Sequence, residues 1–141
     1  MGDFFSGLNF EASGYRLPTE AEWEWLARGG ENYTYAGSDT VDDVAWYVDN
    51  KKGSRDVKTK AANGYGLYDM SGNVCEWCWD WRGDISSSTG ASGASSGDGR
   101  VQRGGSWSAL RSGCEVAGRD GRDQPKNRDK YSGFRLVRNA N

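Results

Sequence analysis

Three cysteines carry the most evident reactive chemistry of the chain, and no histidine accompanies them. Cys75 and Cys78 form a Cys-x-x-Cys pair, whereas Cys114 stands apart. The pair has the spacing of a redox site or of half a zinc site, but zinc needs about four ligands. A redox pair usually opens a helix, whereas VCEWCWDW alternates like a strand, which places the two thiols on opposite faces. We therefore expect ordinary buried thiols.

The composition excludes further classes of function. Without histidine there is no Ser-His-Asp or Cys-His nucleophile system. No apolar run approaches the roughly 20 residues that a membrane span needs. Residues 100–141 hold ten basic and four acidic side chains, against eight and sixteen in residues 1–99. A basic tail can bind nucleic acid. Ion pairs with the acidic half explain these dispersed arginines as well, and we expect no nucleic-acid partner.

One clear helix is predicted over residues 17–30, LPTEAEWEWLARGG. Thr19 and Glu22 have the spacing of a capping box, and the glycine pair at the end supplies a left-handed stop. The apolar face of this helix is formed by Trp23, Leu26 and Ala27. Residues 44–48 are expected to form a buried turn or a second short helix.

The aromatic segment from residue 74 to residue 82 is predicted to be a strand. Trp77, Trp79 and Trp81 form a row on one face of it, opposite Glu76, Cys78 and Asp80. We expect the tryptophan row to lie in the core, and the alternative is a platform on which carbohydrate stacks.

The remaining segments indicate one α+β domain over residues 1–141. Residues 83–99 are nearly pure Gly, Ser, Ala, Thr and Asp, which predicts a long flexible surface loop. Strands are expected at RVQRGGSW, beginning at residue 100, and at GFRLV, residues 133–137. Few helices and long loops suggest that the loops carry the function.

Three blocks in order resemble the formylglycine-generating enzyme (sulfatase-modifying factor) family. They are YRLPTEAEWEWLARGG, NGYGLYDMSGNVCEW, and RVQRGGSW with GFRLV. The resemblance implies a variant of the C-type lectin fold with few short helices, twisted antiparallel strands and long loops. The family domain normally begins well upstream of the first block, so the chain is N-terminally short relative to the family.

The oxidases of that family place two cysteines after the Gly-Gly-Ser segment, and these thiols bind copper(I), which prefers sulfur ligands. By this resemblance the two positions fall on Ala109 and Cys114. Only the second is a cysteine, and one thiolate cannot supply a two-sulfur site. We therefore expect no enzyme activity and assign no catalytic residue.

The stretch RGGSWSALRSGCEVAGRDGRDQPKNRDKYSGFRLV resembles the variable region of proteins diversified by retroelements, and this implies a variable ligand-binding region at 104–134. The implied fixed frame consists of Gly104, Gly105, Trp107, Cys114, Ala117, Arg119, Pro125, Arg128, Gly133 and Phe134. The candidate ligand-binding residues between them are Ser108, Ala109, Leu110, Arg111, Gly113, Gly118, Asp120, Gly121, Arg122, Asp123, Asp129, Lys130, Tyr131 and Ser132. They share neither periodicity nor chemistry, which fits a surface selected for variety. An ordinary polar loop is the alternative. We expect Arg111, Arg122 and Tyr131 to dominate binding.

No cofactor is expected to be required, although a structural calcium ion is implied by the family resemblance. The calcium pattern D-x-x-G-x-V-x-E falls on the side chains of Asp69 and Glu76 and the carbonyls of Gly72 and Val74. The alternative is that Glu76 simply bonds to groups in its own turn.

These observations favour a non-enzymatic, receptor-type binding module, a monomer whose partner is a protein or another surface ligand. The domain itself is not expected to contact a membrane. The resemblance implies display outside the cell or on its surface, although the first ten residues lack the features of an export signal. The alternatives are an oxidoreductase or accessory protein like the formylglycine-generating enzymes, and a carbohydrate-binding domain that uses exposed tryptophans.

Overall fold

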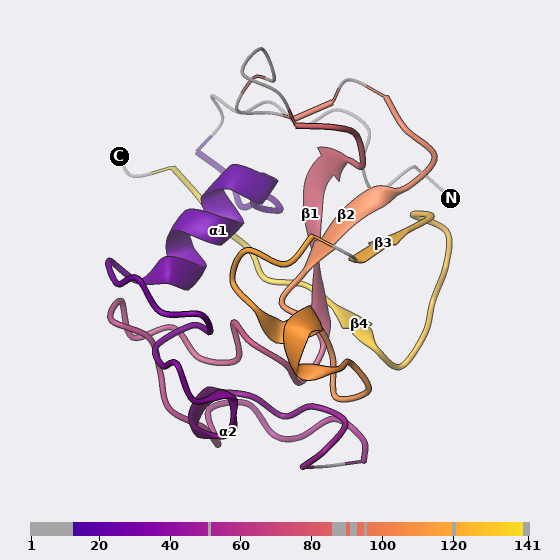
Figure 1. Ribbon diagram of the computed structural model, residues 1–141. Helices are drawn as coiled ribbons and strands as arrows, with labels where there is room; N and C mark the ends of the chain where they lie inside the picture. Colours follow the sequence, from indigo (N-terminus) through magenta and orange to yellow (C-terminus); the bar gives the residue numbers. More distant parts are fainter. Residues whose placement is uncertain are drawn as a thin grey trace.

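The computed structural model describes residues 13–50, 52–85, 90, 93–94, 96–119 and 121–139. Its elements, in chain order, are α1 (Glu20–Arg28), α2 (Val41–Val44), β1 (Cys75–Trp81), β2 (Arg100–Arg103), the 3-10 helix η1 (Arg111–Cys114), β3 (Gly121–Asp123) and β4 (Ser132–Gly133). The strands form one sheet in the order β3-β2-β1-β4, antiparallel except for the parallel pair β1 and β4. Figure 1 shows α1 beside the central strands and α2 at the far end of the molecule. The predicted α+β class is confirmed.

Helix α1 begins and ends where its sequence predicts. The Thr19 hydroxyl accepts the N–H of Glu22 at 3.2 Å, and the Glu22 carboxylate accepts the N–H of Thr19 at 2.8 Å. Gly29 closes the helix in the left-handed conformation. Trp23 and Ala27 are fully buried, and they pack with Met70, Cys78, Val101 and other residues in the larger of two apolar clusters. The helix therefore covers the sheet through its predicted apolar face.

The prediction for the faces of β1 is wrong. Glu76, Cys78 and Asp80 are the buried residues of the strand, whereas the tryptophan row is only half-buried. The carboxylates are buried because they have partners there. Glu76 accepts the Trp23 indole N–H at 2.8 Å, and Asp80 accepts the main-chain N–H of Glu20 at 2.7 Å, at the start of α1. The tryptophan row instead flanks the Arg100 guanidinium, which lies 3.9 Å from the ring centroid of Trp81.

Two other segments depart from prediction or refine it. Only Gly133 of the GFRLV segment belongs to a strand, and Val137 forms an isolated bridge with Arg16. The 44–48 segment follows α2, and its Val44, Ala45 and Tyr47 join a second buried cluster with Cys114. Much of the predicted loop 83–99 lies outside the described residues. No helix in the described part of the chain is long and apolar enough to cross a membrane.

Asp80 makes the stability of the fold sensitive to pH. Burial raises the pKa of this carboxyl from 3.8 to about 6, and the neighbouring Glu20 carboxylate adds to the rise. Because the folded pKa lies above the unfolded one, the neutral form favours folding. That contribution is complete below the unfolded value and is lost as the pH rises through about 6.

We expect Asp80→Asn to raise the free energy of unfolding at about pH 7.5 by up to about 3 kcal/mol, since the buried site then holds a neutral amide. The gain should vanish near pH 4. Urea unfolding at both pH values measures the effect, with exposed Asp56→Asn as the control. A gain of equal size at both pH values contradicts the assignment to Asp80.

Candidate functional site

Main-chain hydrogen bonds fix the predicted variable segment to the rest of the chain. They run from the N–H of Val48 to Ala109, from Trp107 to Asn73, from Val116 to Thr34 and from Cys75 to Tyr131, with lengths of 3.1, 2.8, 2.9 and 2.8 Å. The Ser71 hydroxyl also donates to the Cys114 carbonyl at 2.8 Å. The backbone position of this segment therefore depends little on the side chains that it presents to solvent.

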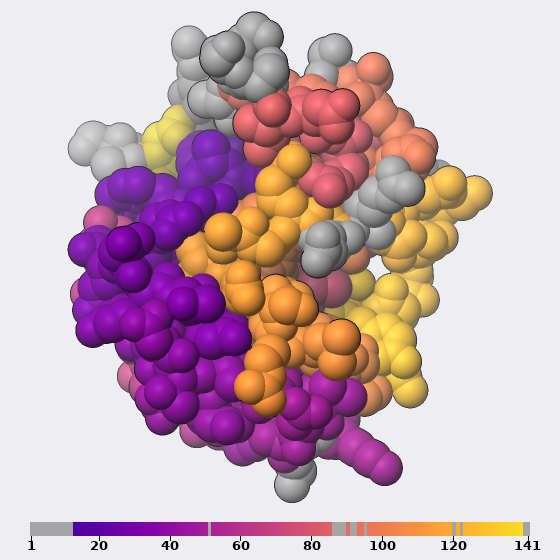
Figure 2. All heavy atoms as spheres, in the orientation of Figure 1, coloured from indigo at the N-terminus to yellow at the C-terminus, as the bar shows by residue number. Residues whose placement is uncertain are grey.

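Several of the predicted binding residues surround one hollow of about 270 Å³. Those that line it are Ser108, Ala109, Gly113, Gly118 and Gly121. Its remaining lining comes from Cys75 on β1, Gln102 on β2 and the turn Gly104–Ser106. Figure 2 shows the orange atoms of this segment on one face, between the purple N-terminal part and the gold C-terminal segment. Small uncharged side chains thus form a recess in an otherwise polar face.

The turn at Gly105 sets the depth of this hollow. Gly105 adopts a φ of +70°, and a Cβ there would lie 2.5 Å from the Gly113 carbonyl oxygen. The turn therefore packs directly against η1, which is possible only without a side chain. This contact brings positions 104–106 and Ser108, Ala109 and Gly113 around the same recess.

An aromatic and basic cluster lies beyond the hollow. The Trp107 and Tyr131 rings have centroids 5.0 Å apart, and the Lys130 ammonium lies 5.3 Å from the first and 5.4 Å from the second. The Trp107 indole N–H donates to the Lys130 carbonyl at 3.2 Å. The Asp129 carboxylate accepts the N–H of Tyr131 at 2.7 Å. Tyr131 is therefore held in place as a planar contact residue, as a binding hot spot requires.

The other predicted binding residues vary in position. Leu110 and Arg111 are exposed, and Arg111 pairs with Asp49 at 3.4 Å. Ser132 accepts the Gln102 side-chain amide at 2.8 Å on β4, while Asp123 lies on β3 at the other edge of the sheet. Asp120 lies outside the described residues, and for Arg122 only the backbone, within β3, is described. The predicted set therefore extends from one sheet edge to the other.

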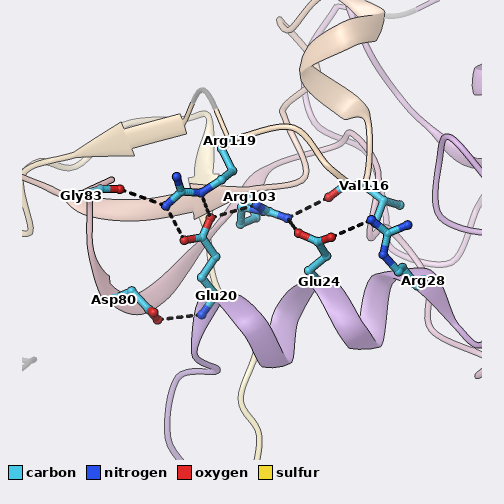
Figure 3. A network of polar contacts seen from close by, with 8 residues as sticks. All are labelled: Glu20, Glu24, Arg28, Asp80, Gly83, Arg103, Val116 and Arg119. Carbon is cyan, nitrogen blue, oxygen red and sulfur yellow. Dashed lines mark hydrogen bonds and ion pairs between the residues drawn. The ribbon is translucent and has the colours of Figure 1, made fainter. Parts of the chain in front are cut away.

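An ion-pair network holds the loop beside the hollow to α1 (Figure 3). Arg119 donates to both oxygens of Glu20, at 2.6 and 2.8 Å. Arg103, whose side chain is fully buried, donates to Glu20 at 2.9 Å, to Glu24 at 2.6 Å and to the Val116 carbonyl at 2.8 Å. These contacts fix both ends of the 116–119 segment. Sequence reasoning placed Arg119 in the frame but did not identify its partner.

The two positions implied for copper lie together but do not form a copper site. Ala109 packs on the buried cluster that contains Cys114. Burial raises the pKa of the Cys114 thiol to about 12, so this sulfur is protonated at neutral pH. Cys75, Cys78 and Cys114 are all free thiols, as predicted. A single thiol does not supply the two sulfur ligands of such a copper(I) site.

Three of the four residues of the calcium pattern, all but Gly72, line one hollow, but they do not fit a calcium ion as they are placed. Asp69, Val74 and Glu76 border a space of about 430 Å³ together with Arg135. Arg135 donates to both Glu76 oxygens, at 2.6 and 2.7 Å. Its guanidinium therefore supplies the positive charge beside Glu76 that a calcium ion would otherwise supply. Asp69 accepts the Lys58 main-chain N–H at 2.8 Å. Within the described residues no group of three or more His, Cys, Asp and Glu side chains could hold a metal.

Calcium is therefore expected to have little effect on stability. Adding about 5 mM calcium, or removing divalent ions with a chelator, should move the Tm by less than about 1 °C, because an ion stabilises only a fold that binds it. Differential scanning calorimetry measures this shift. A rise of several degrees with calcium but not with magnesium contradicts the expectation.

Five residues of the hollow were not predicted as ligand-binding residues. Gly104 and Gly105 were assigned to the fixed frame, and Cys75, Gln102 and Ser106 were not predicted to take part. Gln102 lies opposite Trp77 in the β1–β2 pairing, so it shares a sheet face with Cys75 and with the tryptophan row. The polar side chain of Gln102 in a predicted strand was the one signal that the sequence offered. It becomes informative only once the pairing register of β1 and β2 is known.

Comparisons with known proteins agree with this geometry. Residues 5–140 match the family described as sulfatase-modifying factor enzyme 1-like domain. The structure resembles Treponema denticola variable protein 1 with a TM-score of 0.86 and 45% identity, over 92% of this chain and 49% of that one. It resembles CarF with a TM-score of 0.73 and 33% identity, over 94% of this chain and 50% of that one. These likenesses confirm the predicted C-type lectin-like fold.

A curated relative points to the same family. The formylglycine-generating enzyme of Thermomonospora curvata is 36% identical over 153 residues, which cover 89% of this chain and 50% of that enzyme. The chain thus spans about half the length of these relatives.

Proposed function

We propose that this chain, which belongs to the sulfatase-modifying factor enzyme 1-like family, is a non-enzymatic ligand-binding domain with a retroelement-diversified surface at 104–134. Its partner is a protein or another surface ligand. The likeness to a variable protein supports this proposal.

One observation carries it: five of the predicted binding positions between 108 and 121 line a single hollow, and main-chain hydrogen bonds hold this segment to the rest of the chain. A rigid backbone lowers the entropy cost of presenting a binding surface. Exposed Ser108, Leu110 and Arg111 on one side, and exposed Asp129 and Lys130 on the other, can then change identity without changing the frame.

The direct test is the DNA that flanks the coding segment. We expect a near-copy of the sequence that codes for residues 104–134, differing from it only at adenines, beside a reverse transcriptase gene. The coding segment for residues 17–30 is the internal control and should have no such copy. Absence of the copy, or differences spread equally over all four bases, refutes the diversification.

Loss of the oxidase chemistry has its own test. We expect the native chain to bind no copper(I) in competition with a chromophoric chelator, because position 109 holds no thiol. Ala109→Cys places a second sulfur next to the cluster that contains Cys114 and should gain one equivalent of copper(I). Ala109→Ser, of similar size, is the control. Stoichiometric copper(I) binding by the native chain would contradict the non-enzymatic assignment.

A further inference from the structure

A second surface, remote in sequence from the predicted variable segment, carries unpaired positive charge. Residues 52–60 contain four basic side chains and one acidic side chain, although the whole chain has a net charge of −2. All but Gly53 and Lys60 in this range are exposed. We call it the basic loop surface, and it consists of Trp46, Lys52, Ser54, Arg55, Asp56, Lys58, Thr59, Lys60 and Tyr68. It includes none of the predicted ligand-binding residues.

Its four cations lack carboxylate partners among the described residues. Arg16, Arg103, Arg119 and Arg135 each form an ion pair, whereas none of the described ion pairs involves Lys52, Arg55, Lys58 or Lys60. Asp56 lies within the surface itself, and other carboxylates near it have partners elsewhere. Asp49 pairs with Arg111, Asp42 accepts the Asn50 side-chain amide at 3.0 Å, and Asp69 accepts a main-chain N–H. The positive charge of this surface is thus available to a ligand.

Aromatic rings contact three of these four cations. The Lys60 ammonium lies 4.3 Å from the Trp46 ring centroid, and the Arg55 guanidinium carbon lies 5.9 Å from it. The Lys58 ammonium lies 5.7 Å from the Tyr68 ring centroid. The Trp46 indole N–H donates to the Thr59 hydroxyl at 2.8 Å, which ties the ring to the loop. Charge and aromatic area therefore occur together, as cation–π contacts allow.

A hollow of about 350 Å³ opens beside the Trp46 ring. Its lining consists of Trp46, Ser54, Arg55, Asp56 and Thr59. This volume lies within the range of about 300–1,000 Å³ that small-ligand sites occupy. The indole offers a flat apolar face. The planar Arg55 guanidinium can donate two parallel hydrogen bonds to an anionic group, and the Asp56 carboxylate can accept hydrogen bonds from hydroxyls.

We propose that the basic loop surface binds an anionic carbohydrate, that is, a pyranose chain carrying carboxylate or sulfate groups. A sugar ring has C–H groups for the indole, hydroxyls for Asp56, and an acidic substituent for Arg55 and Lys58. A nucleic acid would offer fewer hydroxyl donors to Asp56 than a sugar chain does. The combination of ring, cation and carboxylate therefore favours the acidic sugar.

The test measures binding of the full chain to three oligosaccharides by isothermal titration calorimetry. An alginate fragment supplies carboxylates, a dextran sulfate fragment supplies sulfates, and neutral dextran supplies neither. Binding of either acidic probe, at least about 10-fold tighter than neutral dextran and weakened by salt, is the expected result. Tighter binding of a single-stranded oligonucleotide than of both acidic sugars would overturn the proposal, as would no binding of either one.

Charge-matched variants separate this surface from general attraction. Arg55→Gln/Lys58→Gln should weaken binding of the acidic sugar about 10-fold or more, whereas Lys126→Gln/Arg128→Gln, an equal loss of exposed charge elsewhere, should change it less than about 2-fold. Trp46→Phe should weaken it further by reducing the stacked area. Equal losses in the two double variants overturn the assignment. If the first double variant unfolds, Lys52→Gln/Lys58→Gln provides the same comparison.

Discussion

Glu20→Ala is expected to lower the free energy of unfolding by about 3–5 kcal/mol, because it removes both carboxylate hydrogen bonds of Arg119 and one of the two carboxylate partners of the buried Arg103. Glu20 is itself buried and accepts hydrogen bonds from Arg103 and Arg119. The Arg103 side chain has no exposed area and also lies 5.3 Å from the Trp23 ring centroid.

Glu24 provides the matched control for this variant. It lies one turn further along α1 and also meets two arginines, but about a third of its side chain is exposed. Glu24→Ala should therefore cost only about 1 kcal/mol, as expected of a partly solvated ion pair. Glu20→Gln, which keeps hydrogen-bonding capacity, should lie between the two. Urea unfolding measures all three, and a cost for Glu24→Ala equal to that of Glu20→Ala contradicts the ranking.

Gly72→Ala is expected to cost more than about 3 kcal/mol, from backbone strain and a steric clash together. Gly72 has a φ of +73°, and a Cβ there would lie 2.4 Å from the Trp46 carbonyl oxygen. That carbonyl accepts the N–H of Asn73 at 2.8 Å, while Gly72 itself donates to the Gly104 carbonyl at 2.7 Å. The turn thus joins the 44–48 segment to the Gly104 turn without space for a methyl group.

The variant Gly66→Ala separates the cost of backbone strain from the cost of the steric clash. It has the same φ of +73°, but a Cβ there would meet nothing within 4 Å. Gly66→Ala should therefore cost only the left-handed conformation, about 1–2 kcal/mol. The difference between the two variants, measured by denaturant unfolding with unchanged m-values, reports the steric part alone. Equal costs would show that the chain around Gly72 relaxes to accept the methyl group.

Local sequence signals predicted the elements whose causes are local. The capping box, the apolar spacing and the glycine stop of α1 lie within a few residues of one another, and the structure reproduces each. The strand at β1 was equally evident from its alternation. Its buried face was predicted wrongly, because the apolar tryptophan face is only half-buried and the burial of Glu76 depends on Arg135, 59 positions later.

The sequence predicted candidate residues for the site but not how these residues are arranged in space. The order β3-β2-β1-β4 decides which of its residues share a hollow and which lie at opposite sheet edges. Arg119 and Glu20, 99 positions apart, are brought together by the same topology. The periodicity of the sequence carries no information on ion pairs between distant residues. The charge imbalance between the two halves of the chain was the only sequence feature that indicated them.

The placement of the predicted binding residues on the two edge strands and on η1 has a consequence for evolvability. The inner strands β1 and β2 and helix α1 carry much of the larger apolar cluster and the buried ion pairs. Mutations at the edges then fall largely on a background that tolerates them. Sequence drift at the surface and selection for a folded core become nearly independent. A lineage with this arrangement can sample many ligand specificities while few of its variants are lost to misfolding.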